Sequence, residues 1–513
     1  MLVKVYAAAL QGINATKVTI EVNCNKGIRF FLVGLPDNAV KEGHERIVSA
    51  LQVNGYAFPR KQIVVNMAPA DIRKEGSAYD LPLAIGILAA AESISAEKLQ
   101  DYMMMGELSL DGTLQPIKGI LPIAIKARED GFAGIIVPKE NAKEAAVVND
   151  LLVYGVDNIK EVIEFFDDKR ELQRTVVNTR EEFFEKQHLF DMDFMDVKGQ
   201  ENVKRALEVA AAGGHNLVMI GPPGAGKSML AKRLPSILPP LTLFEALETT
   251  KIHSVAGKVE KDVSLISVRP FRSPHHTISD AAMVGGGTFP QPGEISLAHH
   301  GVLFLDELPE FTRSVLEVMR QPLEDRKICI SRARFSVEYP ASFMLIASMN
   351  PCPCGFYNHP EKPCVCPPGG VQKYLNRISG PLLDRIDIHI EIVPVPFEKI
   401  STTQPSEASQ DVRNRVIKAR DIQSNRFIEQ KDVFCNAQMS SRLLQKYASP
   451  DKAGLELLKN AMQRLNLSAR AYERILKVAR TIADLDNSES VHSEHIAEAI
   501  NYRNLDRENW GNN

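Results

Sequence analysis

The chain has 513 residues, with 61 Lys and Arg against 64 Asp and Glu, so its formal net charge is −3. A hydrophobic content of 44% and a charged content of 24% are ordinary for folded protein, which excludes dominant disorder and a fibrous repeat. A chain close to neutrality has no uniform basic coat, so any nucleic-acid site must be a local patch. The length suggests about three domains.

No segment is expected to enter a membrane or a secretory pathway. The longest near-continuous apolar run, Leu81–Ala91, is shorter than the ~18–20 residues that a membrane span needs. The first residues lack the charged and then apolar layout of a signal peptide. Seven cysteines in a chain of 513 residues do not make a disulfide scaffold. These features predict a cytoplasmic protein with reduced thiols.

Residues 1–166 are predicted to form an α/β domain, because short apolar runs alternate with amphipathic segments. The runs predict strands at Lys17–Val22, Phe30–Val33, Gln62–Asn66 and Ile135–Pro138, and helices at Asn38–Val53, Leu81–Ala91 and Leu121–Asp130. Residues 167–196 are dense in charges and aromatic rings without clear periodicity, and we interpret them as a linker or packing arm.

Residues 197–396 are predicted to be a second α/β unit that binds a nucleotide. An apolar strand, Val218–Ile220, leads into a glycine-rich loop and then a helix, the context that a phosphate-binding loop requires. Such a loop lets backbone N–H groups face phosphate oxygens at a helix N-terminus. The predicted ATP-binding residues are Gly221, Pro222, Pro223, Gly224, Ala225, Gly226, Lys227 and Ser228. Lys227 is predicted to contact the β and γ phosphates, and Ser228 to bind Mg²⁺.

Two further apolar strands are predicted to end beside this loop. The strand 301–305 ends in Asp306 and Glu307, which are suited to holding Mg²⁺ and to polarising the attacking water. The strand 343–349 ends in Asn350, whose amide could help to place that water. Alone, each is an ordinary strand end, but downstream of the phosphate-binding loop the catalytic interpretation is favoured.

Two segments between these strands have a distinctive composition. Residues 326–334 carry four positive and no negative side chains and continue in β-like alternation, which predicts a basic hairpin. Its predicted DNA contacts are Lys327, Arg332 and Arg334, and the alternative is a solvated sheet edge. Upstream, 269–300 combines paired histidines with a Gly-rich run, which we interpret as an insert loop rather than a metal site.

Four cysteines, Cys352, Cys354, Cys364 and Cys366, bracket a loop-like stretch just after Asn350. Four thiolates around a turn are the ligand set of a structural Zn²⁺ site. Buried thiols are disfavoured as an alternative because Pro, Gly and polar residues surround the cysteines, and redox control is a second alternative. Residues 397–513 begin with a polar stretch and then show long helical patterns, most clearly at Leu455–Leu465, Ala469–Leu485 and Ser493–Arg503.

The three strand-end motifs resemble those of the AAA+ ATPases. Val197-Lys198-Gly199-Gln200 is similar to the segment that cups the adenine there, which implies that Gly199 and Gln200 bind the nucleotide. Ser379–Asp387 resembles the arginine-finger segment of the magnesium-chelatase branch, and Leu467–Arg470 resembles the start of its sensor-2 helix. The resemblance implies that Arg385 reaches a neighbouring subunit's γ-phosphate and that Arg470 reaches its own subunit's, in a ring that is a hexamer in the family.

The N-terminal domain resembles the proteolytic domain of Lon, through Gly106–Gly112, Pro116–Leu121 and the upstream Gly76-Ser77-Ala78. In Lon a serine nucleophile is activated by a lysine, which needs a desolvated amine beside the hydroxyl. Ser77 falls near the place of the serine, but Leu121 occupies the place of the lysine and cannot take a proton. We therefore expect a non-proteolytic scaffold.

Nearly the whole chain resembles the ComM/YifB family of magnesium-chelatase-like ATPases, with a Lon-like domain, an AAA+ core carrying an insert and cysteine pairs, and a helical lid. The resemblance implies an ATP- and Mg²⁺-dependent ring motor that moves single-stranded or branched DNA, as a helicase of branch migration. Two alternatives stay open: a motor subunit for metal insertion into a tetrapyrrole, and a Lon-type peptidase or protein remodeller.

Overall fold

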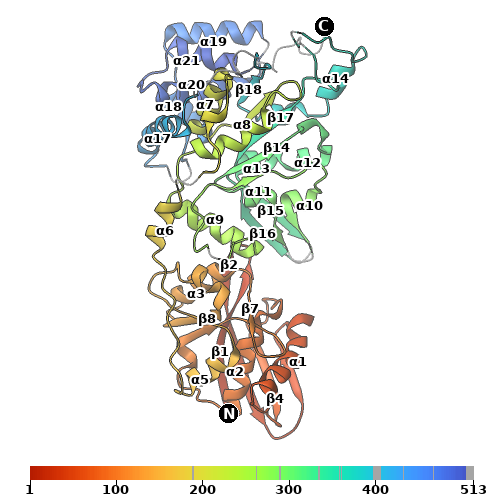
Figure 1. Ribbon diagram of the computed structural model, residues 1–513, viewed down its shortest axis with the longest axis vertical. Coiled ribbons are helices and arrows are strands. Elements are labelled where there is room, and N and C mark those ends of the chain that lie inside the picture. Colours follow the sequence, from red (N-terminus) through yellow and green to blue (C-terminus); the bar gives the residue numbers. More distant parts are fainter. Residues whose placement is uncertain are drawn as a thin grey trace.

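The N-terminal part is built on one seven-stranded mixed sheet, drawn at the bottom of Figure 1. The computed structural model describes residues 1–503 except 188–189, 262, 288–289, 333–334, 358, 360, 397–405, 431–432 and 466. The strand order is β3 (Phe30–Val33), β4 (Gln62–Ala68), β2 (Asn14–Asn25), β1 (Leu2–Gln11), β5 (Tyr102–Met104), β8 (Gly134–Pro138) and β9 (Leu152–Val156). The first two long strands, β1 and β2, form an antiparallel hairpin, whereas β1, β5, β8 and β9 run parallel.

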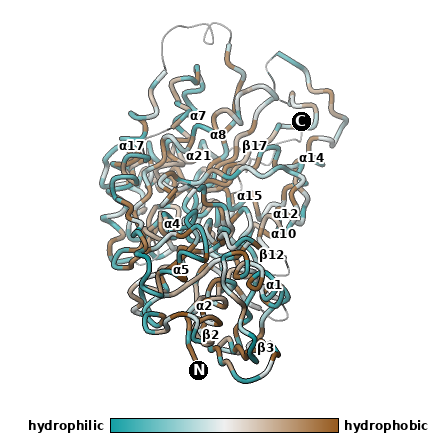
Figure 2. Tube along the Cα trace, turned by 60° about the horizontal axis from the view of Figure 1, so that its bottom comes forward, coloured by the Kyte–Doolittle hydropathy of each residue, from teal (hydrophilic) through white to brown (hydrophobic). Residues whose placement is uncertain are grey.

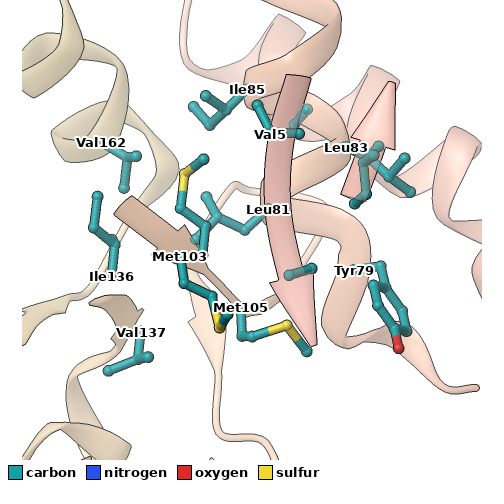
Figure 3. Packing of buried hydrophobic residues seen from close by; sticks show 14 of the residues in the cluster. Val5, Tyr79, Leu81, Leu83, Ile85, Met103, Met105, Ile136, Val137 and Val162 are labelled. Carbon is teal, nitrogen blue, oxygen red and sulfur yellow. The ribbon is translucent and has the colours of Figure 1, made fainter. Parts of the chain in front are cut away.

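Helix α2 (Asp80–Ala90) lies at the centre of this domain, and all of its residues are buried. A helix that is apolar all round must be enclosed by other elements. Its side chains Leu81 and Ile85 pack with Val5 and Met103 of the sheet (Figure 3). The other helices are α1 (Asn38–Val53), α3 (Ile120–Glu129), α4 (Lys139–Ala145) and α5 (Ile159–Phe166). The trace is hydrophilic along the outer turn that leads into β3 (Figure 2).

The predicted linker contains an α-helix, α6 (Thr179–Lys186), which the sequence did not reveal. Its N-terminus is capped by the Asn178 side chain, which accepts a hydrogen bond from the Glu181 N–H. Phe183 is 2% exposed and packs with Leu241 and Leu265 of the next unit. The segment is therefore a packing arm that lies against the second unit.

The second unit contains a five-stranded parallel sheet in the order β11 (Phe271–Arg272), β14 (Val302–Leu305), β17 (Met344–Met349), β10 (Leu217–Ile220) and β18 (Ile388–Glu391). Alternate residues of each strand enter two different cores, as expected for a parallel sheet covered on both faces. On one side, Leu217 and Met219 pack with α7 (Glu201–Gly213), α8 (Lys227–Arg233) and the C-terminal helices. On the other side, Val218 and Ile220 pack with inserted helices and a hairpin.

The inserted elements lie between β10 and β17 in the sequence. They include α9 (Leu243–Ala256), α10 (Asp280–Val284), α11 (Glu294–Leu297), α12 (Arg313–Val318) and α13 (Arg320–Asp325). Two glycines of the predicted insert loop form a small hairpin, in which β12 (Gly285–Gly286) pairs with β13 (Gln291–Pro292). The predicted basic hairpin is β15 (Lys327–Arg332) paired with β16 (Phe335–Pro340).

The C-terminal part is helical, as predicted, and lies at the top of Figure 1. Its helices are α17 (Ser409–Arg426), α18 (Ser441–Tyr447), α19 (Lys452–Arg464), α20 (Ala469–Leu485) and α21 (Ser493–Asn501). Among the described residues, no helix combines the length and the apolar character needed to cross a membrane. The mixed α/β fold with a helical C-terminal part is confirmed, whereas the domain boundaries at 166, 196 and 396 stay predictions.

Candidate active site

The phosphate-binding loop connects β10 to α8 at the carboxyl end of the parallel sheet. Gly224 and Gly226 adopt left-handed backbone conformations, with φ of 79° and 87°, which glycine adopts without steric cost. A Cβ on Gly221 would lie 2.6 Å from the Ile392 carbonyl oxygen, so only glycine permits the approach of this segment to the end of β18. The loop is shaped to present backbone N–H groups at the start of α8.

Lys227 lies at the centre of the loop. Its Nζ donates to the carbonyl oxygens of Gly221 at 2.7 Å and Pro222 at 2.9 Å, and to Asn350 Oδ1 at 3.0 Å. Burial lowers the pKa of this ammonium, while Asp306 and Glu307 nearby act in the opposite direction. A cation held in a partly desolvated place between a glycine-rich loop and two carboxylates is suited to bind phosphate oxygens.

Asp306 and Ser228 meet directly. The Ser228 hydroxyl donates to Asp306 Oδ2 at 2.7 Å, and the Ser348 hydroxyl donates to the other carboxylate oxygen. This contact arises because β14 and β10 both pair with β17 in parallel, so that their carboxyl ends lie at the same edge. A hydroxyl and a carboxylate are oxygen ligands that Mg²⁺ prefers, so the donor set fits this ion.

The strand ends also place the two remaining polar residues predicted for catalysis. Asn350 follows β17 and holds Lys227, as described above. Glu307 follows β14 with φ of 55°, a left-handed conformation that is uncommon for a residue with a side chain, and it is exposed. The structure therefore brings Lys227, Ser228, Asp306 and Asn350 together, with Glu307 at the rim.

The predicted adenine-side residues lie at the next strand end. Gly199 and Gln200 both have left-handed backbones, and Gln200 Nε2 donates to the Val393 carbonyl oxygen at 2.7 Å. Residues 392 and 393 directly follow β18, and the N–H of Ile392 donates to the carbonyl oxygen of Ile220 at 2.6 Å. These contacts place Gly199 and Gln200 next to the start of the phosphate-binding loop.

The two arginines predicted to act in trans or as a sensor contact residues outside the phosphate-binding loop. Arg385 is 6% exposed, and it contacts Glu324 and the carbonyl oxygen of Pro381 within its own chain. Arg470, at the start of α20, lies 3.7 Å from Asp384. These contacts place Arg470 beside the Arg385 segment, and they include no residue of the phosphate-binding loop.

The predicted DNA-contact residues are only partly described. Lys327 is exposed and pairs with Glu338 across the hairpin at 3.0 Å, which offsets part of its charge. Arg332 belongs to β15 opposite Phe335, but its side chain lies outside the described residues, as does the whole of Arg334. Their contact with DNA stays a prediction.

The four cysteines form one cluster, defined here as the cysteine knuckle (residues 352–366). The Sγ of Cys352 lies 3.3 Å from that of Cys354 and 3.8 Å from that of Cys364, and Cys354 Sγ lies 3.6 Å from Cys364 Sγ. All four sulfur atoms, including that of Cys366, lie within 4.8 Å of one another. A tetrahedral site with Zn–S bonds of ~2.3 Å has sulfur–sulfur edges of ~3.8 Å, so the cluster fits zinc.

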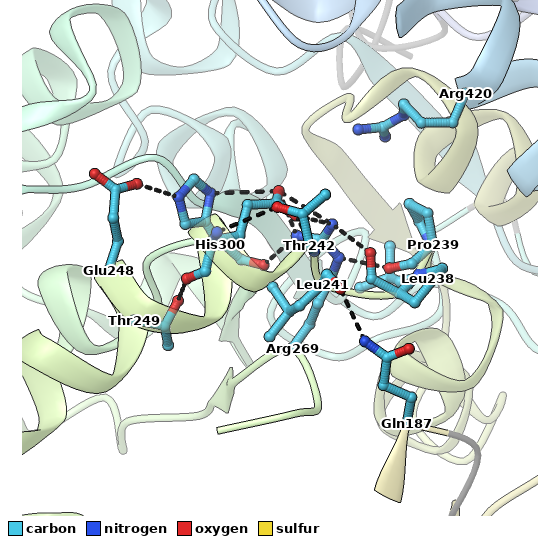
Figure 4. Close-up of polar contacts among 12 residues, drawn as sticks. Gln187, Leu238, Pro239, Leu241, Thr242, Glu248, Thr249, Arg269, His300 and Arg420 are labelled. Atoms are coloured by element: carbon cyan, nitrogen blue, oxygen red, sulfur yellow. Dashed lines mark hydrogen bonds and ion pairs between the residues drawn. The ribbon is translucent and has the colours of Figure 1, made fainter. Parts of the chain in front are cut away.

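A second group of possible metal ligands, Glu248, His299 and His300, behaves differently. His300 Nε2 lies 2.9 Å from Glu248, and Figure 4 shows these side chains facing one another beside the Arg269 network. The N–H of Ser342 donates to His299 Nδ1, so the neutral ring carries its proton on Nε2 and offers no lone pair there. Burial lowers the pKa of His299 to about 4, which keeps the ring neutral. This group links α9 to the segment before β14 and is not suited to bind a metal.

Three contacts around the site were not found by sequence reasoning. Ser348 donates to Asp306, His276 Nδ1 lies 3.8 Å from Glu307 Oε2, and the backbone N–H of Asn350 is close enough to Tyr374 to oppose the rise that burial causes in its pKa. The paired histidines were the available signal, because two adjacent imidazoles in an insert loop are unusual, but their partner is distant in the sequence.

In the Lon-like part of the N-terminal domain, Ser77 lies beside a carboxylate and Leu121 lies in the core. The Ser77 hydroxyl donates to Glu107, and Leu121 is fully buried in the hydrophobic core. Leu121 lies in the first turn of α3, where its N–H donates to Glu144 Oε1 at 3.2 Å. The position that holds the lysine in Lon therefore carries an apolar side chain in this core.

Comparisons with known proteins agree with this arrangement. The chain matches models of the magnesium chelatase subunit ChlI over residues 20–141 and 193–400, and of the C-terminal part of that subunit over 406–503. It is 43% identical over 505 residues to competence protein ComM of Haemophilus influenzae, covering 98% of this chain and 97% of the relative. It is 45% identical over 509 residues to YifB of Escherichia coli, with the same coverage. It is also 31% identical over 159 residues to Lon protease 2 of Bacillus subtilis, which covers 28% of this chain and 27% of that protein.

The parallel sheet, the glycine-rich loop and the Asp-Glu strand end define an AAA+ ATPase, a class that uses ATP and Mg²⁺. Within this class, the chain belongs to the ComM/YifB family of magnesium-chelatase-like proteins.

Proposed function

We propose that this chain is the subunit of a ring motor that hydrolyses ATP to move DNA, as a helicase of branch migration. The observation that carries the ATPase part is the convergence of Lys227, Ser228, Asp306 and Asn350 at one edge of the sheet. In this proposal Lys227 neutralises phosphate charge, Ser228 and Asp306 hold the magnesium ion, and Glu307 polarises the attacking water. Bound magnesium would supply charge neutralisation at the phosphates.

The DNA part of the proposal rests on the basic hairpin and on the family resemblance. Lys327 is exposed on β15, and Arg332 and Arg334 follow it in the sequence. A patch of cations on a near-neutral chain is where a polyanion would bind, with strong dependence on salt. Assembly into a ring, a hexamer in the family, is part of the same proposal, because an arginine finger such as Arg385 acts on a neighbour's nucleotide.

Arg385 forms an ion pair with Glu324 of its own chain. Contact between Arg385 and a neighbouring subunit's nucleotide therefore requires this ion pair to break. Arg470 lies beside it, next to Asp384. We propose that both arginines respond to nucleotide, and we propose a structural zinc ion in the cysteine knuckle. Mass spectrometry of the purified chain is expected to find one zinc per chain.

Metal insertion into a tetrapyrrole is a second candidate, because the matched family models carry the name of a magnesium chelatase subunit. A Lon-type peptidase or remodeller is disfavoured by the buried Leu121. The two remaining classes differ in what increases ATP turnover: branched DNA for the proposed motor, and a tetrapyrrole-binding partner for the alternative.

The test is ATP turnover of the purified chain with linear, forked and four-way DNA. We expect at least a several-fold increase in ATP turnover with branched DNA. Glu307→Gln should lose turnover without losing ATP binding, and Lys227→Ala should lose ATP binding.

The double variant Arg332→Ala with Arg334→Ala should weaken DNA binding and flatten its salt dependence. Lys452→Ala with Lys459→Ala, which removes two exposed cations from α19, is the matched control. Turnover that no DNA changes would contradict the DNA part alone.

A further inference from the structure

The cysteine knuckle directly adjoins the ATP site. Only Pro351 separates Asn350, which holds Lys227, from Cys352. Cys352 is fully buried, whereas Cys364 is exposed at the other end of the knuckle. A change in the shape of the knuckle therefore begins two residues from an active-site side chain.

A turn of the knuckle also packs against the phosphate-binding loop. Gly355 has φ of +84°, and its N–H donates to the Cys352 carbonyl oxygen at 3.0 Å. A Cβ added to Gly355 would lie 2.6 Å from Cδ and 3.2 Å from Cγ of Pro223. Pro223 is exposed at the tip of the loop, and its ring is rigid. The backbone of Gly355 thus packs closely against the Pro223 ring of the phosphate-binding loop. A larger residue at 355 would fit only if one of the two segments moved.

The chain that leaves the knuckle contacts two more parts of the ATP site. Helix α14 (Gly370–Leu375) starts four residues after Cys366, and burial raises the pKa of Tyr374 to about 12 while the backbone N–H of Asn350 nearby acts in the opposite direction. Arg377, just beyond the helix, donates to the Glu310 carboxylate at 2.9 and 3.0 Å. Glu310 ends the short helical turn that follows Glu307. The knuckle is therefore connected to the phosphate-binding loop, to Asn350 and to the segment that carries Glu307.

We propose that a zinc ion bound by the four cysteines holds the ATP site in its binding shape, so that nucleotide affinity depends on occupancy of the knuckle. The physical reason is that four thiolates at these separations repel one another unless a cation joins them, and that a bound metal fixes a loop that has little hydrophobic core of its own. Loss of the metal frees Gly355 and Asn350 to move, which removes support from Pro223 and Lys227. This inference rests on the proposed ATPase function and on the proposed zinc ion.

The experiment compares zinc content and nucleotide affinity in three variants of the full chain. Cys364→Ser should lose zinc and bind a fluorescent ATP analogue about 5- to 10-fold more weakly. Gly355→Ala should keep its zinc but show a similar loss of affinity, because the added methyl group displaces Pro223. Gly369→Ala is the matched control: Gly369 also has a left-handed backbone, with φ of +73°, but a Cβ there meets no atom within 4 Å. It should keep both zinc and affinity.

The possible failures are distinguishable. A wild-type chain without zinc would overturn the metal site, and one that binds no ATP would overturn the proposed function. A wild-type chain that holds zinc and binds ATP, with unchanged affinity in both Cys364→Ser and Gly355→Ala, would overturn the coupling alone. Thermal unfolding of each variant, together with zinc retained in Gly355→Ala, separates a local effect from general misfolding.

Discussion

Glu307 and His276 illustrate how two single residues meet at the rim of the ATP site. Glu307 lies beyond the end of β14, has a left-handed backbone and is exposed. The strand therefore does not fix the position of its side chain. His276 Nδ1 lies 3.8 Å from Glu307 Oε2, close enough for a charged imidazole to attract the carboxylate. The neighbouring ring of His275 packs against His276 in a tilted arrangement, with centroids 4.1 Å apart, and its Nδ1 lies 2.9 Å from the Thr277 hydroxyl. We interpret His276 as a positioning residue for Glu307.

The first prediction concerns this pair. His276→Ala should lower the maximal rate of ATP hydrolysis about 10-fold while leaving the KM for ATP nearly unchanged, because the carboxylate loses its orienting partner. His275→Ala is the control and should keep more than half of the rate. His276→Gln should restore part of the rate, because its side-chain amide can still donate to the carboxylate. Equal rates in both alanine variants would exclude the positioning role.

At the scale of elements, the start of β18 and the lid helix α20 are joined by a buried ion pair. Asp387 lies next to the start of β18 and is 1% exposed. It accepts hydrogen bonds from Arg474 of α20 at 2.8 Å and from the Asn216 N–H at 2.9 Å. Burial acts to raise the pKa of Asp387, but Arg474 and His215 outweigh it and hold the pKa well below its usual range. Because Arg385 lies two residues before Asp387 and Arg470 lies on α20, the ion pair joins the two segments that carry these arginines.

The second prediction follows from that burial. Asp387→Asn should lower the free energy of unfolding by about 3 kcal/mol at neutral pH, because it removes the buried anion that pairs with the partly buried Arg474. In the wild type this contribution is present above the ordinary pKa of an aspartate and is lost as the pH falls towards the depressed folded value. Asp384→Asn, which removes the more exposed pair with Arg470, is the control and should cost less than about 1 kcal/mol. Chemical denaturation at pH 7 measures both, and equal costs would contradict the assigned ion pair.

At the scale of the whole molecule, the N-terminal domain docks on the AAA+ unit through α3 and α9. The N–H of Gly119 donates to the Ser254 carbonyl oxygen at 2.9 Å, and the N–H of Leu121 donates to Glu144 Oε1 at 3.2 Å and to Ser254 Oγ at 3.4 Å. Ile13, at the tip of the β1–β2 hairpin, packs against the core that includes β15 and β16. Figure 1 shows these two hairpins meeting where the units join. The basic hairpin is thus supported by the Lon-like domain.

The third prediction is that the free energy of unfolding depends on pH through Glu144, which lies at this contact. Burial raises the pKa of Glu144 to about 7 against the opposing hydrogen bonds, whereas the unfolded carboxyl titrates near 4.5. Between these values the folded chain keeps a proton that the unfolded chain has lost, so stability falls as the pH rises from 4.5 to 7. Glu144→Gln lacks this loss and should be more stable than the wild type at pH 8 by roughly 2 to 3 kcal/mol.

Thermal unfolding of both proteins from pH 5 to pH 8 measures the effect. Glu140→Gln is the control, because Glu140 and Lys261 form an exposed pair at 3.0 Å and their loss should change stability little. Parallel pH profiles for the wild type and Glu144→Gln would show that Glu144 is not the group that titrates.

Local patterns along the chain were sufficient to predict many elements. The helices over Asn38–Val53 and Ala469–Leu485 begin and end where their patterns predicted, because an apolar face and a capping residue are both encoded locally. Asp37 caps the first of these helices and Ser468 the second. By contrast, α6 was not predicted, because its mostly charged sequence carries one buried ring, Phe183, whose partners come from the next unit.

The sequence by itself determined the class of protein and most of the candidate site, because the glycine-rich loop and the strand-end carboxylates have short-range spacings that the chemistry of phosphate binding requires. Only the tertiary structure decided which distant residues complete the site: His276 beside Glu307, Ser348 on Asp306, and the knuckle turn at Gly355 against Pro223. It also placed Arg470 beside Asp384, next to Arg385, and paired Arg385 with Glu324. The physical reason is that such contacts depend on sheet order and on the packing of inserts, which no local pattern encodes.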